Sequence, residues 1–203
     1  MSPPAPVEFY FDFSSPYSYI ASSWIDALAA RHGRRVQRHA ILLGATFQVA
    51  ELKSPVSHPL KREYSLLDFE RSARFEGLPY KPPSSFPQPT QNAARLFWWL
   101  ADTQGADVAA AWARAGLHAM FTRDTALNDN AALRTLAAEN GIHAETAEAV
   151  WNDPQWKARL KRANDEAIAA GVFGAPWFVI DGEPFWGNDR KPQIERWLAS
   201  GAF

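Results

Sequence analysis

The sequence predicts an α/β fold in which a helical block interrupts a small sheet-forming domain. Three observations support this: strand patterns occur at both ends of the chain, the segment between them has helical periodicity, and 47% of the 203 residues are hydrophobic. A chain of this length can bury one sizeable core. We therefore expect a discontinuous α/β domain of residues 1–45 and 171–203, into which residues 46–170 are inserted as an all-helical subdomain.

The N-terminal segment has the pattern of a strand, a helix and a second strand. Residues 7–13 favour a buried strand, which ends at the breaker cluster of residues 14–16. Either serine of that cluster can cap a helix and its proline suits the first turn, so a helix is expected up to Gly33. A second strand is expected over residues 35–43.

The middle block is expected to be helical apart from a proline-rich stretch at residues 78–89. The last of its candidate helices contains Pro154, which can divide it. The apolar spacing predicts helices over residues 59–76, 90–103, 107–121, 130–140 and 144–170.

The C-terminal segment returns to strand character. Residues 177–180 and 183–186 flank an Asp-Gly pair, which is a strong signal for a tight turn between antiparallel strands. A closing helix is expected over residues 189–200.

Charge and hydropathy limit the classes of partner. The 21 Lys and Arg residues nearly cancel the 22 Asp and Glu residues, so no basic field attracts a nucleic acid. No apolar window approaches the roughly 20 residues of a membrane span, and the first six residues carry no Lys or Arg. We therefore expect no signal peptide and no membrane partner, and a cytoplasmic location.

The chain contains no cysteine. This excludes disulfides, thiolate metal sites, cysteine nucleophiles and thiol–disulfide chemistry carried out by the protein's own side chains. The five histidines do not form a His-x-x-x-His pair, so no metal site is expected.

Hydroxyl groups occur where the first strand meets the first helix. In open α/β sheets ligands gather at that edge, and the free N–H groups of a helix N-terminus favour an anion such as a thiolate. Ser14 and Ser15 are candidates for this role. The simpler interpretation is that they only cap the helix.

Two late segments are further candidates. If the Ala175–Pro176 bond is cis, the N–H and C=O of Ala175 turn outward toward an extended ligand, although a trans proline at a strand entrance is the commoner case. Gly187 permits close approach of a ligand, and Asn188 with Asp189 could bind the ammonium and carboxylate of an amino-acid end. The alternative is that one of these two caps the last helix.

The order of these features resembles that of thioredoxin-like proteins. Ser15 and Ser18 stand where the two active cysteines of such proteins would be. With the helical insertion, the whole chain resembles the DsbA-like branch, specifically the 2-hydroxychromene-2-carboxylate isomerases and the related kappa-class glutathione transferases. The resemblance is most specific in residues 9–19 (FYFDFSSPYSY), 172–176 (VFGAP) and 181–190 (DGEPFWGNDR).

The resemblance implies glutathione as cofactor. Ser15 would hydrogen-bond the glutathione sulfur and hold it as a thiolate, so that Ser15 is the activating group and glutathione the nucleophile. Ala175, next to Pro176, would pair its backbone with the cysteinyl part. The γ-glutamyl end would be held by Trp186, Gly187, Asn188 and Asp189.

The resemblance also implies the reaction. The thiolate adds reversibly to a small aromatic carboxylate of the 2-hydroxychromene-2-carboxylate type. The ring then opens, a single bond rotates, and the sulfur leaves to give trans-o-hydroxybenzylidenepyruvate. Phe86 would lie opposite the site, and Phe47 and Gln48 would face the substrate. The resemblance further implies a homodimer.

Two positions depart from the family pattern. A lysine is frequent in the family near Gln48, and this sequence has none there, so the partner of the substrate carboxylate is open. Lys53, Lys61 or Arg62 could replace it, although such residues are usually solvated surface. Trp177 stands where threonine is frequent, and its bulk could narrow the pocket.

Two other functions remain as alternatives. The chain could be a kappa-like glutathione transferase, or a non-catalytic thioredoxin-like module that holds an extended peptide at the edge formed by Ala175 and Pro176. Binding of glutathione with thiolate formation distinguishes the enzyme from the module.

Overall fold

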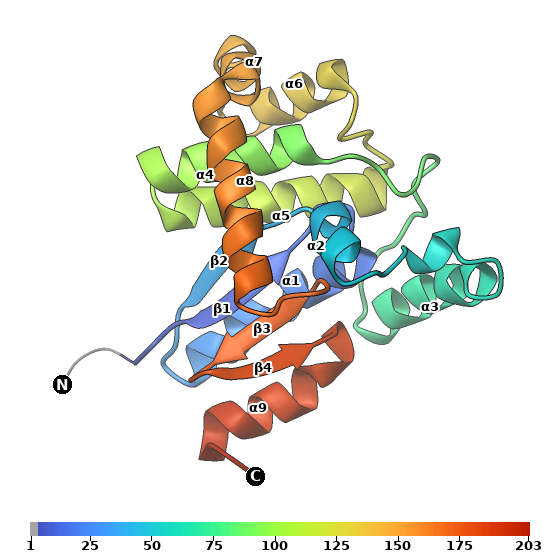
Figure 1. Ribbon diagram of the computed structural model, residues 1–203, viewed down its shortest axis with the longest axis vertical. Coiled ribbons are helices and arrows are strands. Elements are labelled where there is room, and N and C mark those ends of the chain that lie inside the picture. The colour runs from blue at the N-terminus through green and yellow to red at the C-terminus, as the bar shows by residue number, and fades with distance from the viewer. Residues whose placement is uncertain (1–3) are drawn as a thin grey trace.

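The computed structural model describes residues 4–203, so residues 1–3 of the predicted first domain segment lie outside the described part. Figure 1 shows the helical block above a small sheet, with the C-terminal helix on the opposite side of the sheet. The elements in chain order are β1 (Val7–Phe11), α1 (Pro16–Arg31), β2 (Val36–Ala40), α2 (Leu43–Val49), η1 (Pro55–Ser57), α3 (Arg62–Phe75), α4 (Gln91–Thr103), α5 (Ala106–Arg123), α6 (Asn130–Glu139), α7 (Ala144–Asn152), α8 (Pro154–Ala169), β3 (Trp177–Ile180), β4 (Glu183–Trp186), η2 (Asn188–Arg190) and α9 (Lys191–Ser200).

The sheet has the strand order β2-β1-β3-β4. β1 pairs in parallel with β2, as a strand–helix–strand unit requires, and antiparallel with β3. β3 and β4 form the predicted hairpin, with Asp181 and Gly182 at its turn. β4 contains Pro184 and lies at the edge of the sheet. A proline is tolerated there because the N–H that it lacks is not needed for pairing with a neighbouring strand. The first and last segments of the chain therefore meet in the centre of one sheet.

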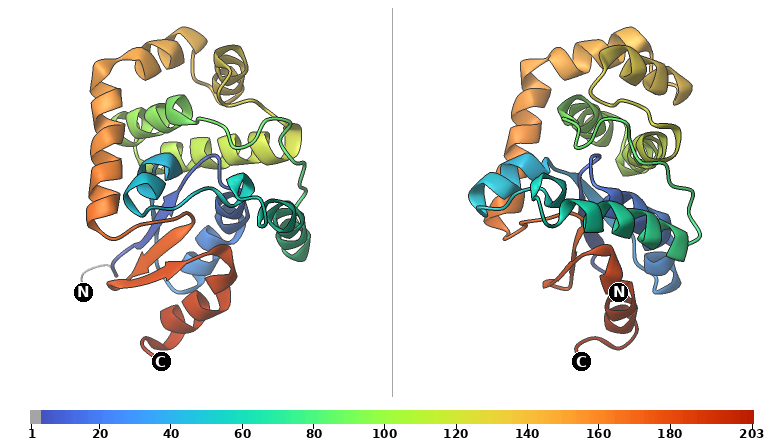
Figure 2. Two further views of the ribbon diagram at one scale, coloured as in Figure 1. Left: turned by 45° about the vertical axis from the view of Figure 1, so that its right-hand side comes forward. Right: turned by 90° about the vertical axis from the view of Figure 1, so that its right-hand side faces the viewer.

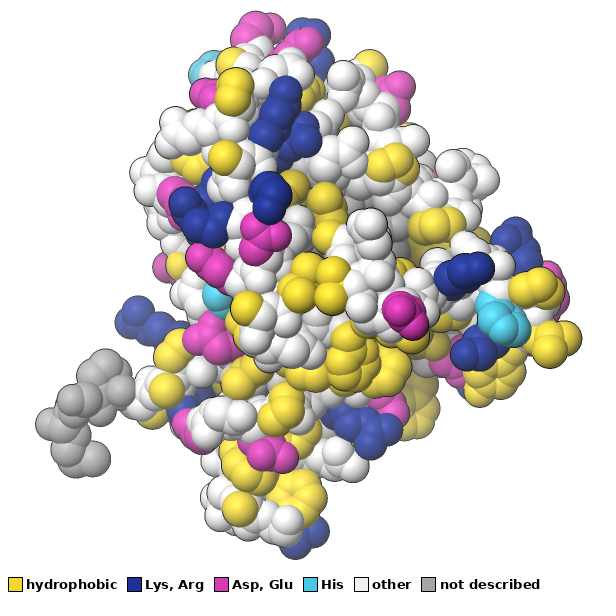
Figure 3. Space-filling view, viewed as in Figure 1, with side chains coloured by type: hydrophobic (Ala, Val, Ile, Leu, Met, Phe, Trp, Pro, Cys, Tyr) yellow, Lys and Arg dark blue, Asp and Glu magenta, His cyan; other side chains and the backbone are white. Residues whose placement is uncertain are grey.

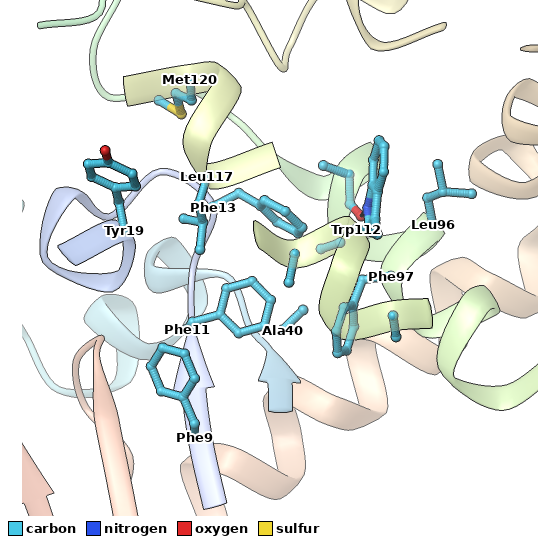
Figure 4. Packing of buried hydrophobic residues seen from close by; sticks show 14 of the residues in the cluster. Phe9, Phe11, Phe13, Tyr19, Ala40, Leu96, Phe97, Trp112, Leu117 and Met120 are labelled. Carbon is cyan, nitrogen blue, oxygen red and sulfur yellow. Dashed lines mark hydrogen bonds between the residues drawn. The ribbon is translucent and has the colours of Figure 1, made fainter. Parts of the chain in front are cut away.

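One face of the sheet builds the main core. Phe9, Phe11 and Phe13 point to the same side and are fully buried, and Figure 4 shows that they continue into Phe97 of α4 and Trp112 of α5. The Phe9 ring stacks on Phe178 of β3 at 5.1 Å between centroids. This row of rings leads directly into the residues that follow β1.

The opposite face of the sheet carries a smaller cluster. It joins the C-terminal end of α8 to the segment that enters β3. Its buried members are Ile41, Ala167, Val172, Ala175 and Trp177. Because α8 ends against this face, the chain returns from the helical block at the edge where β1 ends (Figure 2).

The helical insertion covers the sheet on the β2 side. Figure 2 shows α4 and α5 in a layer above the sheet, α6 and α7 beyond them, and α8 running back down to the strands. The indole N–H of Trp98 in α4 donates to the carbonyl of Ala40 at 3.0 Å, which fixes this layer to the end of β2. α3 lies apart from this layer, beside α1 (Figure 1).

Most predicted elements are present, with two differences. The predicted second strand is too long: β2 ends at Ala40, and the apolar residues after it begin the short helix α2, which runs across the predicted domain boundary at residue 45. The predicted helix 59–76 begins later, at Arg62. The predicted helix 144–170 is divided at Pro154, as its sequence allows, and the proline ring occupies the first turn of α8. The division into two domains stays a prediction.

In the part of the chain that the structure describes, no helix combines the length and the apolar character needed to cross a lipid bilayer.

Candidate active site

A cavity of about 1090 Å³ opens where the helical insertion meets the sheet domain. Its walls come from the start of α1, from α2, from α3, from residues 86–91, and from residues 174–176 and 186–190. In Figure 3 apolar side chains gather on this face, between α2, α3 and the end of β4. The volume is at the upper end of the usual range for small-molecule sites, which is roughly 300–1,000 Å³.

Ser15 lies in the floor of the cavity and is 3% exposed. It is the N-cap of α1: its Oγ accepts a hydrogen bond from the Ser18 N–H at 3.1 Å. The same hydroxyl donates to the carbonyl of Ala175 at 3.0 Å. The predicted capping role is therefore present, and in addition the hydroxyl contacts the second predicted segment, 160 residues away. Ser18 itself is fully buried and does not line the cavity.

A buried carboxylate holds the floor together. Asp12 Oδ1 accepts from the Ser14 N–H at 2.7 Å and from the Thr90 hydroxyl at 3.0 Å, and its Oδ2 accepts from the Leu43 N–H at 2.7 Å. Since these donors stand at the beginnings of α1, α4 and α2, one side chain joins three helix N-termini. Burial raises the pKa of the Asp12 carboxyl, while the two backbone hydrogen bonds and the Thr90 hydrogen bond act in the opposite direction.

The Ala175–Pro176 peptide bond is cis. The Ala175 carbonyl accepts the hydrogen bond from Ser15, so it is engaged within the protein, whereas residues 4–203 supply no partner for the Ala175 N–H. Gly174 precedes this pair. A Cβ at residue 174 would collide with the Trp186 indole, so this position must have no side chain. A second cis bond joins Phe86 to Pro87 in the cavity wall.

The segment after β4 forms the next part of the wall. Trp186 is 53% exposed and meets Phe173 edge-on, with 4.8 Å between ring centroids. Gly187 has a φ of +108°, and a Cβ there would collide with Asp189 Oδ1, so this turn requires glycine. Asp189 and Arg190 pair at 2.5 Å, and Arg190 is the one cation among the described residues that line the cavity.

The far wall is mostly aromatic. Phe47 of α2 and Phe86 line it, together with Phe69 of α3, whose ring meets the Phe86 ring edge-on at 5.9 Å between centroids. Tyr17 of α1 meets Phe69 on its other side at 5.0 Å and donates its hydroxyl to Asp68 Oδ2 at 2.6 Å. Burial, reinforced by the bond to Asp68, raises the pKa of Tyr17, so its phenol stays protonated.

The cavity gathers all but one of the site residues predicted from the sequence. Those that line it are Ser15, Phe47, Phe86, Ala175, Pro176, Trp186, Gly187, Asn188 and Asp189. Gln48 is exposed on α2 and is not among the lining residues. The three candidate cations Lys53, Lys61 and Arg62 are also exposed and lie outside the lining, and Trp177 is buried in the smaller core cluster.

The polar residues that the structure adds to this site include Asp12, Tyr17, Asp68 and Arg190. Asp12 could have been identified from the sequence, because it is an acidic residue within a run of aromatic residues, and a charge in a buried segment needs hydrogen-bond partners. Asp68 has no comparable signal, since it looks like any surface acid on an amphipathic helix. Among residues 4–203, no group of three or more histidine or acidic side chains could hold a metal ion.

Comparisons with known proteins agree with this architecture. Residues 6–199 match the family described as DSBA-like thioredoxin domain. A 2-hydroxychromene-2-carboxylate isomerase of Sphingobium xenophagum is 30% identical over 194 residues, covering 95% of this chain and 97% of that protein. Glutathione s-transferase kappa 2 of Caenorhabditis elegans is 25% identical, covering 95% of this chain and 91% of that protein. A solved structure of a 2-hydroxychromene-2-carboxylate isomerase superposes with a TM-score of 0.85 at 25% identity, covering 95% of this chain and 94% of that one.

Proposed function

Because the chain belongs to the DSBA-like thioredoxin domain family, and within it to the family of the 2-hydroxychromene-2-carboxylate isomerases, we propose that it is a glutathione-dependent isomerase. Its proposed substrates are small aromatic carboxylates of the 2-hydroxychromene-2-carboxylate type, converted to trans-o-hydroxybenzylidenepyruvate. The observation that carries this proposal is the Ser15 hydroxyl, buried at the N-terminus of α1 in the floor of a large cavity.

Ser15 suits the activation of a bound thiol. An ordinary thiol has a pKa of about 8.5 and is largely protonated at neutral pH. A hydroxyl donor and the positive end of a helix dipole both favour the thiolate. The chain has no cysteine to use this position, so the thiol must come from a ligand.

The surrounding residues fit a tripeptide thiol. The Ala175 N–H is free to donate to the cysteinyl carbonyl of glutathione. The Ser15 hydroxyl has one hydrogen to donate, and in this structure it donates it to the Ala175 carbonyl. When glutathione binds, the hydroxyl must therefore rotate so that it donates to the sulfur instead. The vacated carbonyl then accepts from the cysteinyl N–H, and no buried group loses its partner.

The γ-glutamyl end fits the segment after β4. Asp189 offers a carboxylate for its ammonium, and Arg190 with the amide of Asn188 offers donors for its carboxylate. The bare backbone at Gly187 lets the ligand approach closely. When bound, glutathione would supply the sulfur nucleophile that opens the ring and later leaves. The aromatic side chains Phe47 and Phe86 would hold the flat ring beside it.

A kappa-like glutathione transferase is the second candidate, favoured by the similarity to the Caenorhabditis elegans kappa protein. The two functions share the thiol site and differ in whether the sulfur leaves the product. Mass spectrometry of the reaction mixture separates them, because a transferase accumulates a thioether whereas an isomerase regenerates free glutathione.

The test is calorimetric titration with glutathione while thiolate absorbance is followed near 240 nm. We expect saturable binding and a thiolate signal at neutral pH. Ser15→Ala should remove that signal and lower turnover by roughly 10²–10⁴. Ser23→Ala is the matched control, since it removes a hydroxyl from the same helix. Among residues 4–203, that hydroxyl donates to the Ile20 carbonyl alone.

Two results would contradict the proposal. Absence of binding at several millimolar glutathione would leave Ser15 as a helix cap and favour the peptide-binding module. Unchanged turnover in Ser15→Ala would remove Ser15 from the chemistry. The homodimer implied by the family resemblance stays a prediction, which sedimentation equilibrium checks directly.

A further inference from the structure

The charged groups of the cavity are distributed unevenly between its two sides. Arg190 is the one cation that residues 4–203 contribute to the lining, and it lies beside the segment proposed to hold the γ-glutamyl end. The N-terminus of α1, with its positive partial charge, is in the floor next to Ser15. The α3 side contributes no cation to the lining and contributes the carboxylate of Asp68. The lining cation and the positive end of α1 therefore both lie on the thiol side.

Asp68 is held in place as an acceptor. Its side chain is 23% exposed, and its Oδ2 takes the short hydrogen bond from Tyr17 at 2.6 Å. The Ser72 hydroxyl approaches the same oxygen at 3.5 Å, and the Arg71 guanidinium approaches Oδ1 at 3.3 Å. Arg71 is mostly exposed, lies over the Tyr64 ring and is outside the lining of the cavity, so solvent screens its charge.

Tyr17 reinforces the acceptor character of this wall. The Tyr17 hydroxyl donates its hydrogen to Asp68, so toward a ligand the Tyr17 oxygen can act only as a hydrogen-bond acceptor. The phenol remains protonated since burial and Asp68 both disfavour tyrosinate. The two side chains thus present oxygen acceptors and the negative charge of one carboxylate to the cavity.

The rest of this wall is apolar. Phe69 separates Tyr17 from Phe86, and the three rings meet edge to face. An aromatic ring placed against them would have its far end near Asp68. A hydroxyl on that end gains a charge-assisted hydrogen bond, whereas a second carboxylate there meets a like charge in a partly desolvated site.

We propose that Asp68, positioned by Tyr17, determines which ring substituents the cavity accepts: a hydroxyl on the ring end improves binding, and a carboxylate on the ring end is rejected. This inference rests on the proposed function, since it concerns the second substrate of the same cavity. A substrate with one carboxylate should then place that group away from Asp68.

The test measures binding of unreactive probes, so that it does not depend on turnover. Three benzylacetones differ only at the para position of the ring, which carries a hydroxyl, a methoxy or a carboxylate group. Their saturated chains cannot add a thiol. Dissociation constants are measured by calorimetry with glutathione present, for the wild type, for Asp68→Asn and for Glu70→Gln.

In the wild type the hydroxyl probe should bind at least about tenfold more tightly than the carboxylate probe, with the methoxy probe between them. Asp68→Asn should reduce the hydroxyl-to-carboxylate ratio by about tenfold, mainly by improving the carboxylate probe. Glu70→Gln is the matched control: it removes the same charge from the exposed face of the same helix and should leave the ratio unchanged.

The outcomes separate this inference from the proposed function. If glutathione itself does not bind, the proposed function fails. If glutathione binds but the wild type binds the carboxylate probe as tightly as the hydroxyl probe, or binds neither, the inference is wrong while the proposed function stands. The wild-type comparison decides this even if Asp68→Asn does not fold.

Discussion

Asp12 illustrates how a single buried side chain can organise a site without touching a reacting atom. Its carboxylate joins the starts of three helices at one cavity, because it accepts from the Ser14 N–H just before α1, from the first N–H of α2 at Leu43, and from the Thr90 hydroxyl at the N-cap of α4. Burial disfavours the charge and the hydrogen bonds favour it, and burial is the larger effect, so the pKa of the Asp12 carboxyl is raised.

Asp12→Asn should change the pH dependence of stability. The pKa of Asp12 in the folded protein is raised above its ordinary value of 3.8, so the folded chain keeps a proton that the unfolded chain has already released. The stability due to this group is therefore full at low pH and falls as pH rises through the folded pKa. Asparagine does not titrate.

The difference in unfolding free energy between wild type and Asp12→Asn should thus decrease as pH is raised from about 4 toward neutrality. Urea denaturation at a series of pH values measures it. A difference that is constant over this range would mean that Asp12 does not titrate there.

Ser15 combines two roles that substitutions can separate. Ser15→Ala removes a helix cap and should cost about 0.5–2 kcal/mol of unfolding free energy. Ser15→Asn should restore most of that stability, because asparagine caps well, yet it should not restore the thiolate of bound glutathione. Urea midpoints and the 240 nm signal are compared on the same samples. Recovery of the thiolate signal with asparagine would argue against a specific need for the hydroxyl.

At the scale of elements, the position of the floor depends on how closely α5 approaches the loop that follows β1. Gly116 of α5 packs against Phe13, the residue just before Ser14, and a Cβ there would lie 2.6 Å from the Phe13 ring. The helix and this loop can meet so closely only because residue 116 has no side chain. The loop carrying Ser15 is thereby packed against a helix of the insertion.

Gly116→Ala should destabilise the protein by about 1–3 kcal/mol through overpacking, although alanine is the better helix former. Gly44→Ala is the matched comparison: Gly44 lies in α2, and a Cβ there meets nothing within 4 Å. It should be neutral or stabilising by up to about 1 kcal/mol. Thermal or urea unfolding checks both, and equal effects would mean that Phe13 simply moves aside.

The element that sequence reasoning missed shows where local patterns fail. Residues 41–43 continue an apolar run and therefore predict strand, but Leu42 caps a helix and the Leu43 N–H bonds to Asp12. That bond comes from a residue 31 positions earlier, so no window centred on residue 43 contains it. Pro154, by contrast, divides its helix for a local reason, and the sequence predicts that division.

For the whole molecule, the order of strands and helices and the α/β class with a helical insertion were predictable, because apolar periodicity survives burial. The motif at residues 9–19 and the segment 186–189 contain most of the predicted site residues that line the cavity. Asp68 and Arg190 could not be identified as such, since whether a charged side chain faces a cavity or solvent depends on tertiary packing. Gln48 was placed by analogy with a family lysine, and it lies outside the lining.

Glutathione binding should stabilise the entire fold rather than one part. At a concentration 100 times its dissociation constant it should add about 2.7 kcal/mol to the unfolding free energy, if it binds only the folded state. Differential scanning calorimetry should show one transition that moves to higher temperature. A ligand-sensitive transition beside an insensitive one would show that the helical insertion unfolds independently.

The hydrogen bond between Ser15 and Ala175 also bears on synthesis. The candidate site needs residues 12–17 together with residues 174–190, and the helical insertion emerges from the ribosome between them. A growing chain therefore exposes the Ser15 loop without the Ala175 carbonyl while the insertion is being synthesised. Such distant pairing slows folding, and the nascent protein completes this site only after residues 174–190 have emerged.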